Sequence, residues 1–342
     1  MTTTAGHVLG IDSGGSGIRI AVAPADGTGS PLTWTSPAPA GVDARRLLDL
    51  VLPAARDLLA RTGAEHCEAA CVGAAGMVAL GADLRAVLPD ALRGALGVRR
   101  LALASDAVTA YTGALGQRPG AVVAAGTGMV ALGTDLTPQG GWRRADGWGH
   151  LLGDSGGGAW IGRAGLEAAL RAYDGRAGGS SALLARATAV FGPAADLPAA
   201  LYPRPDRPAV LASFAPEVAR CAPADPVAAR ILREAARHIA GAAAAVCPSD
   251  RPESGRMACP PAGTAEPRAT DVTYEVALTG GLFRMGDPLL APLHEELQSQ
   301  LPHAQLVDAA GTPLDGALRV AGALMTDSLR LPTDPAMLRI IC

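Results

Sequence analysis

Apolar runs alternate with amphipathic segments along the first third of the chain. Short apolar runs predict strands, and longer segments with apolar residues at helical spacing predict helices. Strands alternating with helices form a parallel or mixed sheet covered by helices, so this part predicts an α/β unit. The expected strands cover residues 7–12, 17–23, 31–35, 68–74 and 99–104, and the expected helices cover 43–62, 82–96 and 107–115.

The remainder opens with two apolar runs within 120–133 that predict a hairpin, and long helical segments follow. Residues 248–271 contain five prolines and little apolar periodicity, so we expect them to form a mobile surface insertion without chemistry. Helices are expected near 157–173, 180–191, 226–246, 287–300 and 315–330, with strands at 274–279 and 304–308.

A turn of small residues joins the first two expected strands. It follows Asp12 and consists of Ser13, Gly14, Gly15, Ser16 and Gly17. Small residues reach backbone angles closed to bulkier ones and leave amide N–H groups free to approach a phosphate. Asp12 is placed to hold a magnesium ion beside that phosphate, directly or through water. Taken alone, an ordinary β-hairpin explains the segment equally well.

The same pattern occurs a second time, and a third pair of glycines follows a later strand. Gly126, Thr127 and Gly128 form the second turn, between the apolar runs of 120–133. This repetition favours two related halves that face each other across a cleft, each presenting a phosphate-binding hairpin. Gly280 and Gly281 follow the strand expected at 274–279, where bare backbone can lie flat against an adenine or a ribose.

Composition narrows the chemistry. All 29 basic residues of the 342-residue chain are arginines. The absence of lysine excludes a Walker A lysine, a pyridoxal Schiff base and the lysine of a protein-kinase fold. A formal net charge of −3 gives no support to a nucleic-acid partner and favours a small-molecule substrate. The length and the 49% hydrophobic share favour two domains.

The six cysteines show no C-x-x-C spacing, so we expect buried reduced thiols rather than a disulfide framework or a zinc site. The first residues lack the basic start and apolar core of a signal peptide. No uninterrupted apolar stretch reaches the length that a membrane span needs. We therefore expect a cytoplasmic protein without a membrane partner.

Asp106 is the candidate for acid–base chemistry, because it follows the strand expected at 99–104. In open α/β sheets, ligands collect beyond the carboxyl ends of the strands, so a carboxylate at this point faces the cleft. The competing interpretation is that Ser105 or Asp106 merely caps the helix expected at 107–115.

A second candidate is DGWGHLLGDSGGGAWIGRAGLEAAL, residues 146–170. Its glycines, among them Gly149, let the backbone approach a ligand closely. Trp148 offers a flat face suited to a sugar ring, and Asp154 lies at the mouth of the helix that begins near residue 157. We expect Trp160 in the core. Trp148 is flanked by glycines and polar groups, so we expect it outside the core.

The segments GIDSGGSG, SDAVTAY, AAGTG, GWGHLLGDSGGGAWIG and LTGG follow one another in this order. The series resembles the sugar kinases of the actin-like ATPase superfamily, specifically the BadF/BadG/BcrA/BcrD-type family, which includes N-acetylglucosamine kinases and bacterial glucosamine kinases. The resemblance covers nearly the whole chain. It implies two actin-like, ribonuclease H-like α/β domains facing across a cleft: residues 1–117, with a C-terminal helix from 313–342 packed back on them, and residues 118–312.

The resemblance further implies transfer of the γ-phosphoryl group of ATP, with Mg²⁺, to the 6-hydroxyl of an amino sugar, with N-acetylglucosamine as the leading acceptor. Asp106 matches the general base beside the sugar, and Asp12 matches the residue that orients magnesium. Trp148, Gly149 and Asp154 match the sugar-binding segment, to which Met129 is added as the residue after the second turn. The residues that match the ATP-binding turns are Ser13, Gly14, Gly15, Ser16, Gly126, Thr127, Gly128, Gly280 and Gly281.

Two departures from the family pattern leave the acceptor open. The segment SPAPAG at 36–41 stands where a polar residue, often asparagine, is expected, and Met129 stands where serine is usual. Glucosamine, N-acetylglucosamine and other hexosamines or hexoses therefore remain alternatives, and a homodimer is left open as well.

Two functions of other classes remain as alternatives. An ATP-driven activator of a radical dehydratase would hold an iron–sulfur cluster through cysteines in glycine-rich loops, whereas the cysteines here are expected in helices or in the proline-rich insertion. A sugar-sensing regulator without activity would carry a DNA-binding segment, which we do not expect before residue 7, and would have no need of Asp12 and Asp106.

Overall fold

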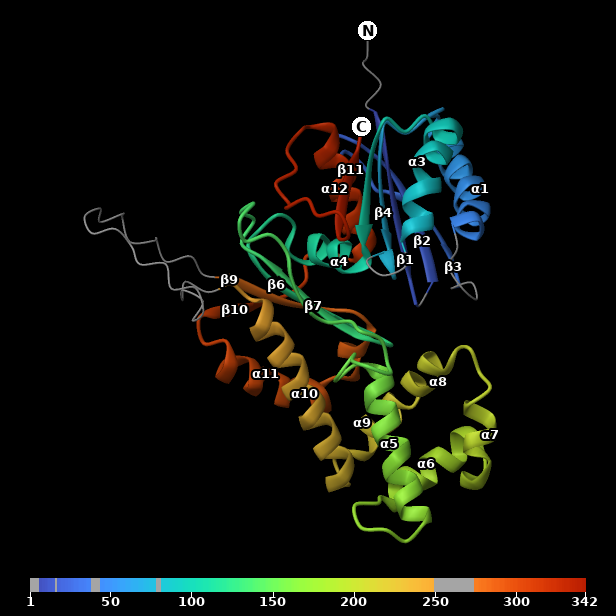
Figure 1. Cartoon of the computed structure of the whole chain (residues 1–342), viewed down its shortest axis with the longest axis vertical. Coiled ribbons are helices and arrows are strands. Elements are labelled where there is room, and N and C mark those ends of the chain that lie inside the picture. Colours follow the sequence, from blue (N-terminus) through green and yellow to red (C-terminus); the bar gives the residue numbers. More distant parts are fainter. Residues whose placement is uncertain (1–5, 16, 38–43, 78–80, 249–273) are drawn as a thin grey trace, which may run out of the picture.

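The computed structural model describes residues 6–15, 17–37, 44–77, 81–248 and 274–342. These residues form two mixed β-sheets with helices packed against them, which confirms the expected α/β fold. Figure 1 shows the two sheets one above the other along the long axis of the molecule. We call the part built on the six-stranded sheet the first lobe and the part built on the five-stranded sheet the second lobe.

The first lobe has the strand order β11-β5-β4-β1-β2-β3. Strands β1, β4 and β5 are parallel, whereas β2, β3 and β11 run antiparallel to their neighbours. Helices α1 and α3 cover one face of the sheet, and α4 and α12 cover the other. The strands are β1 (His7–Gly14), β2 (Gly17–Pro24), β3 (Leu32–Ser36), β4 (Ala69–Ala74), β5 (Arg100–Ser105) and β11 (Leu338–Ile341), and the helices are α1 (Ala44–Thr62), α3 (Ala82–Leu96), α4 (Asp106–Leu115) and α12 (Pro313–Met325).

The second lobe has the strand order β10-β9-β6-β7-β8, in which β6, β9 and β10 are parallel. Helix α10 packs on this sheet, and helices α5 to α9 extend to the far end of the molecule (Figure 1). The strands are β6 (Gly120–Ala125), β7 (Met129–Thr134), β8 (Arg143–Asp146), β9 (Tyr274–Thr279) and β10 (Ala304–Val307). The helices are α5 (Gly158–Tyr173), α6 (Ser181–Phe191), η1 (Ala194–Asp196), α7 (Leu197–Leu201), α8 (Arg207–Ser213), α9 (Ala215–Cys221), α10 (Pro226–Val246), η2 (Gly281–Met285) and α11 (Asp287–Gln300).

Helix α4 lies between the lobes, because it contacts β4 and β5 of the first sheet and β6, β7 and β9 of the second. It also packs closely on α12, where glycines bring the two backbones together. A Cβ built on Gly316 would lie 1.9 Å from the carbonyl oxygen of Thr109, and one built on Gly113 would lie 2.1 Å from that of Thr312. The last helix is thus held against the centre of the molecule.

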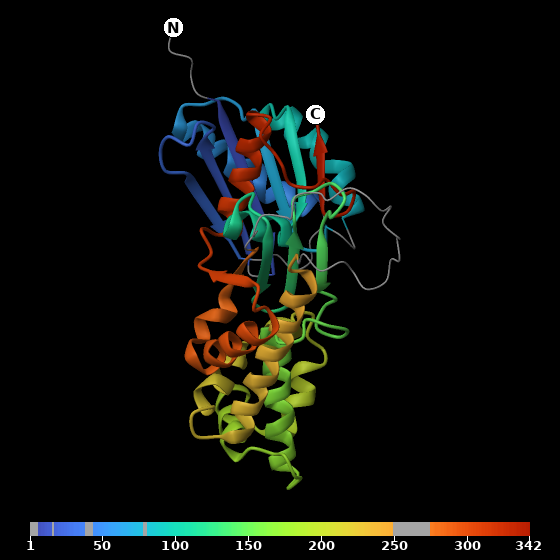
Figure 2. The same ribbon diagram turned by 90° about the vertical axis from the view of Figure 1, so that its left-hand side faces the viewer.

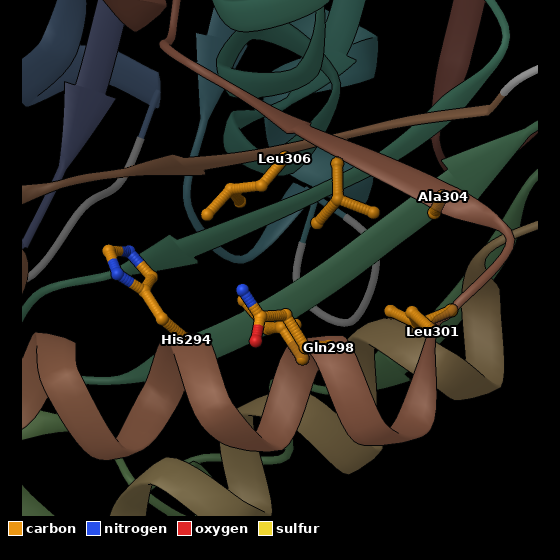
Figure 3. Close-up of a pocket in the computed structure, with 7 residues that line it drawn as sticks. His294, Gln298, Leu301, Ala304 and Leu306 are labelled. Carbon is orange, nitrogen blue, oxygen red and sulfur yellow. The ribbon is translucent and has the colours of Figure 1, made fainter.

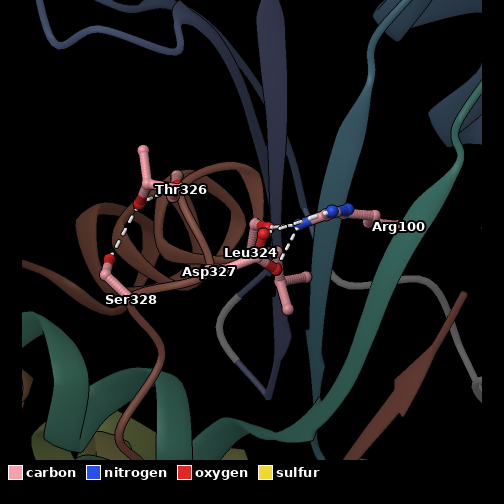
Figure 4. Close-up of polar contacts among 6 residues, drawn as sticks. Arg100, Leu324, Thr326, Asp327 and Ser328 are labelled. Atoms are coloured by element: carbon pink, nitrogen blue, oxygen red, sulfur yellow. Dashed lines mark hydrogen bonds and ion pairs between the residues drawn. The ribbon is translucent and has the colours of Figure 1, made fainter.

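The C-terminal part differs from the prediction. The helix expected near 315–330 ends at Met325, and β11, which was not predicted, pairs antiparallel with β5. The guanidinium of Arg100 on β5 donates to the carbonyl oxygen of Leu324 and lies 2.7 Å from the carboxylate of Asp327, which fixes the end of α12 to the sheet (Figure 4). Figure 2 shows the red helix α12 over the strands of the first sheet and the red strand β11 at the edge of that sheet, on the side away from the blue strands.

Strand β8 and helices α7, α8 and α9 were not predicted, because each is short and has a weak periodic signal. The expected insertion at 248–271 lies outside the described residues except at its first position, and so does most of SPAPAG.

Candidate functional site

The carboxyl ends of the parallel strands of the first sheet bring Asp12 and Asp106 to one edge. Asp12 on β1 is in register with Gly73 of β4, which is in register with Ala104 of β5. Asp106 begins helix α4 directly after β5. The two carboxylates therefore lie at the same edge of the sheet with one strand between them, where α/β folds bind their ligands.

Ser105, rather than Asp106, caps helix α4. The Ser105 hydroxyl oxygen accepts a hydrogen bond from the Val108 amide at 3.3 Å, whereas the Asp106 carboxylate accepts from the amide of its neighbour Ala107 at 2.9 Å. Because the capping position is already filled, the carboxylate of Asp106 is not needed to close the helix. The competing interpretation of this residue is thereby weakened.

The pKa of Asp106 is raised to about 6, chiefly by burial and in part by the nearby negative charge of Asp12. The Ala107 amide and the positive charge of Arg144, on β8 of the second lobe, act in the opposite direction. A carboxyl group with a pKa near neutrality is matched to proton transfer at physiological pH.

Asp12 is a buried carboxylate, with 4% of its surface exposed. Burial raises its pKa, while Arg19, its cross-strand neighbour on β2, lowers it through a hydrogen bond of 3.0 Å. Magnesium in phosphate-binding sites is usually held by one or two carboxylates together with water and phosphate oxygens. Asp12 fits the role of such a carboxylate.

The first small-residue turn is tighter than expected. Strand β1 runs through Ser13 and Gly14, and β2 starts at Gly17, so only Gly15 and Ser16 join the strands, of which Ser16 lies outside the described residues. A Cβ built on Gly14 or Gly15 would meet no atom within 4 Å. The turn therefore borders open space rather than packed protein.

The second turn, Gly126–Gly128, lies against the start of helix α5. The Gly158 amide donates to the carbonyl oxygen of Gly126, and the Ala159 amide donates to that of Thr127, at 2.9 and 2.8 Å. A Cβ on Gly126 would meet nothing within 4 Å, whereas one on Gly128 would lie 2.3 Å from the Asp154 carboxylate. This turn thus has one open side and one side joined to the segment that contains Asp154.

Gly280 and Gly281 lie beside the second turn. Gly280 follows β9, has φ +110° and would bring a Cβ to 2.1 Å from the carbonyl oxygen of Ala125, the residue before the turn. Only glycine fits so close an approach at this φ value. The two glycine-containing turns of the second lobe therefore meet at the carboxyl ends of β6 and β9.

The loop from 146 to 155 is held by Asp146, a residue that the sequence analysis did not single out. The Asp146 carboxylate accepts from the amides of Asp154 and Ser155, at 2.5 and 2.9 Å. The Asp154 carboxylate in turn accepts from the Gly149 amide at 3.1 Å. Burial raises the pKa of Asp154, the amides of Gly149 and Met129 lower it, and the charge of Asp146 raises it.

Trp148 is 69% exposed, as expected for a residue outside the core, whereas Trp160 is partly buried and packs against the core of the second lobe. The guanidinium carbon of Arg144 lies 4.8 Å from the centre of the Trp148 ring. Met129 is only 2% exposed, so its side chain belongs to the core, and it meets the loop through its amide.

The described residues enclose two hollows, of which one lies next to the loop from 146 to 155. The one next to the loop has a volume of about 400 Å³ and is bordered by Trp148, Leu152, Arg237 and His238. The other, about 310 Å³, lies between α11 and the edge strand β10, away from the turns described above (Figure 3). Its lining is mostly aliphatic, with His294 and Gln298 as the polar side chains. The loop hollow is the one that adjoins the candidate site.

A sequence model of the BadF/BadG/BcrA/BcrD ATPase family matches residues 9–321. The chain belongs to this family. The match includes every element that carries the two carboxylates, the glycine turns and the loop from 146 to 155. Among the described residues, no helix is long and apolar enough to cross a membrane.

Three proteins are similar to this chain, two of them with solved structures. An N-acetylmuramic acid/N-acetylglucosamine kinase of Clostridium acetobutylicum is 29% identical over 176 residues, which are 50% of this chain and 55% of that protein. The chain thus matches about half the length of this curated relative. A crystal structure from Chromobacterium violaceum, provisionally described as an N-acetylglucosamine kinase, is 28% identical over 92% of this chain and 98% of that chain, with a TM-score of 0.66. The ROK hexokinase of Thermus thermophilus shares the fold at 18% identity, covering 94% of this chain and 99% of that chain, with a TM-score of 0.54.

Proposed function

We propose that this family member transfers the γ-phosphoryl group of ATP to the 6-hydroxyl of an amino sugar, with N-acetylglucosamine as the leading acceptor and glucosamine or another hexosamine as the alternative. The observation that carries the proposal is the carboxylate of Asp106, which is not needed as a cap and lies beside Asp12 at the ligand-binding edge. The similarity to the Clostridium and Chromobacterium proteins supports the choice of acceptor.

On the nucleotide side, the glycine turns supply backbone amides for phosphate. The open space around Gly14, Gly15 and Gly126 leaves room for phosphate oxygens. We assign the β- and γ-phosphates to the turns after β1 and β6, and the adenosine to the backbone of Gly280 and Gly281. This arrangement needs no lysine, in keeping with a chain whose basic residues are all arginines.

On the acceptor side, Asp106 accepts the proton of the attacking hydroxyl as the phosphoryl group arrives. Phosphoryl transfer through a loose transition state depends chiefly on positioning and charge neutralisation, so a carboxylate that receives the proton late is sufficient. Trp148 offers a ring face to the sugar, and Gly149 and Asp154 offer an amide and a carboxylate to its hydroxyls. Magnesium, held by Asp12, would neutralise phosphate charge when bound.

Water competes with the sugar as acceptor, so we propose that two domains, residues 1–117 with 313–342 and residues 118–312, close over both substrates. The two sheets, with α4 between them, support this division. With ATP and a sugar as substrates, we propose that the protein acts in the cytoplasm.

The activator alternative receives no support from the cysteines that the structure describes. Cys221 lies on α9 and Cys247 follows the last residue of α10, whereas Cys71 is buried in β4, Cys67 is buried between α1 and β4, and Cys342 is exposed after β11, so the expectation that the cysteines lie in helices or in the insertion is wrong for these last three. None of the five lies on the glycine turns that follow β1, β6 and β9. Cys259 lies outside the described residues.

The test is ADP release with Mg-ATP and a panel of sugars, followed by NMR assignment of the phosphorylated position. We expect turnover with an amino sugar and phosphate on its 6-oxygen. The ratio of kcat/KM for glucosamine and N-acetylglucosamine then identifies the preferred acceptor. Absence of turnover with every amino sugar and hexose would refute the proposal.

The variant that tests the role of Asp106 as general base is Asp106→Asn. It should lower kcat by about 10² to 10⁴-fold, the usual contribution of general-base catalysis, while ATP binding measured by calorimetry is retained. Full activity of Asp106→Asn would show that Asp106 is not the general base and has a structural role.

A further inference from the structure

Arg144 is a cation of the candidate site that the proposed function has not used. It lies on β8, in register with Leu132 of β7, and points its side chain along the loop that follows its own strand. Its Nε donates to the carbonyl oxygen of Asp146 at 3.0 Å, and one terminal nitrogen donates to that of Gly147 at 2.6 Å. Arg144 thus binds both carbonyl oxygens of the first turn of the loop.

The same guanidinium lies against the indole of Trp148, 4.8 Å from the ring centre. Guanidinium groups are attracted to the face of an aromatic ring, more strongly where water is partly excluded. Trp148 is otherwise 69% exposed, and a side chain so exposed has few contacts to fix its rotamer. Arg144 supplies such a contact.

Backbone geometry makes this support necessary. Asp146 and Gly147 both have positive φ values, 62° and 74°. A left-handed conformation at a non-glycine residue costs energy that the surroundings must offset. The carbonyl oxygens that Arg144 binds belong to these two residues, so the guanidinium stabilises the strained turn at its centre.

The Arg144 guanidinium donates its hydrogen bonds to carbonyl oxygens. Among the described residues, no carboxylate side chain forms an ion pair with Arg144, whose two hydrogen bonds go to carbonyl oxygens. Arg144 is therefore held in the loop by carbonyl oxygens and by the Trp148 ring.

We propose that Arg144 is the positioning residue of the acceptor site: it fixes the turn at Asp146 and Gly147 and orients Trp148 against the sugar. This inference rests on the proposed function for its kinetic consequences. Its structural part, the ordering of Trp148, stands independently.

The experiment compares Arg144→Met, which removes charge and hydrogen bonds, with Arg144→Lys, which keeps the charge but loses the planar fork. Losing a charge-assisted hydrogen bond should raise KM for the sugar about tenfold or more in both variants. KM for ATP should change little. Arg230→Met, which removes an exposed arginine of α10, is the matched control and should leave both KM values unchanged.

A double-mutant cycle tests whether Arg144 acts through Trp148. If it does, Arg144→Met in a Trp148→Ala background should raise KM for the sugar much less than it does in the wild type. Fully additive effects would overturn the positioning role, and so would a wild-type KM in Arg144→Met.

Fluorescence separates this inference from the proposed function. Acrylamide quenching of Trp148, isolated by difference from Trp148→Phe, should increase in Arg144→Met and remain the same in Arg230→Met, whatever reaction the protein catalyses. Unchanged quenching in Arg144→Met would overturn the ordering of Trp148. Should the wild type phosphorylate no sugar while quenching responds as expected, the proposed function fails and the structural role of Arg144 stands.

Discussion

The negative charge of Asp12 on β1 raises the pKa of Asp106, which follows β5, two strands away in the same sheet. The two carboxylates are thus coupled, and each has a different partner: Arg19 beside Asp12, and the Ala107 amide beside Asp106. Asp12 is therefore the better-compensated charge, suited to remain ionised and hold a cation, whereas Asp106 is the better proton acceptor.

Activity should fall on acidification as Asp106 becomes protonated. With a pKa of about 6 in the free protein, kcat/KM for the sugar should decrease below about pH 6, because only the ionised carboxylate accepts a proton. The charged groups that act on Asp106 are Asp12, paired with Arg19, and Arg144. Arg144→Met should move this limb to higher pH, and Arg144→Lys should not. Profiles of kcat/KM against pH for the three proteins measure both effects, and a wild-type profile that is flat between about pH 5 and pH 7 would contradict the assignment.

Stability should show the opposite pH dependence. The folded-state pKa of Asp106 lies above its unfolded value of 3.8, so the folded protein binds the proton more tightly. The stabilisation by that proton is fully present below about pH 4 and is lost as the pH rises through about 6. Asp106→Asn should therefore be more stable than the wild type at pH 8, by on the order of 2 to 3 kcal/mol, with the difference vanishing near pH 4. Denaturant unfolding at the two pH values measures it, and equal stability at pH 8 would show that burial does not strain the carboxylate.

The glycines of the second turn should separate packing from binding. Gly126→Ala adds a methyl group to open space, so the fold should tolerate it while KM for ATP increases. Gly128→Ala places the methyl group 2.3 Å from the Asp154 carboxylate, so KM for the sugar should increase as the loop shifts. Steady-state kinetics with each substrate varied in turn measure the two effects. Identical responses of the two variants would argue against separate roles for the two sides of this turn.

Two glycines of α12 should respond in opposite directions to alanine. Gly316→Ala forces a methyl group to 1.9 Å from the carbonyl oxygen of Thr109, and such overpacking costs about 1 to 3 kcal/mol. In the same helix, a Cβ built on Gly322 would meet no atom within 4 Å. Gly322→Ala should therefore stabilise the protein by about 0.5 to 1 kcal/mol. Thermal unfolding of both variants provides the comparison. Tolerance of alanine at position 316 would mean that α4 and α12 are not in close contact.

Arg19 should compete with magnesium for Asp12, because it donates to the carboxylate at 3.0 Å. At pH 8, Arg19→Met should lower the Mg²⁺ concentration for half-maximal activity, and Asp12→Asn should raise it. Titration of activity with Mg²⁺ at fixed ATP measures the change. An unaltered Mg²⁺ dependence in Asp12→Asn would exclude this carboxylate from the metal site.

Short-range patterns predicted the parts of the site that depend on local sequence. The strand-turn-strand segments around Asp12 and Gly126 were predicted, and so was Asp106 after β5, because apolar periodicity and small residues mark them directly. Whether Asp106 caps its helix depends on one hydroxyl rotamer, that of Ser105, which no pattern reveals.

Features set by distant contacts escaped prediction. Strand β11 exists because it pairs with β5, more than 200 residues earlier in the chain, and β8 is too short to show a period. Arg144 and Asp146 act through carbonyl and amide groups of a loop whose conformation is not encoded in residue spacing. Both residues stand close to glycines and a tryptophan in the sequence, and apart from their charge nothing in that segment marks them as residues that hold the loop.

The pairing of β11 with β5 also affects the order in which the protein can be built during translation. The second sheet comes from one continuous stretch of chain, from β6 to β10, and its strands have all been synthesised before α12 and β11. The first sheet begins with β1 and is completed by β11, Leu338–Ile341, which is synthesised after every strand of the second sheet. Domains that fold during synthesis usually do so from the N-terminus onward. The first lobe, whose strand β1 is synthesised first, can therefore be completed only after all strands of the second lobe have been synthesised.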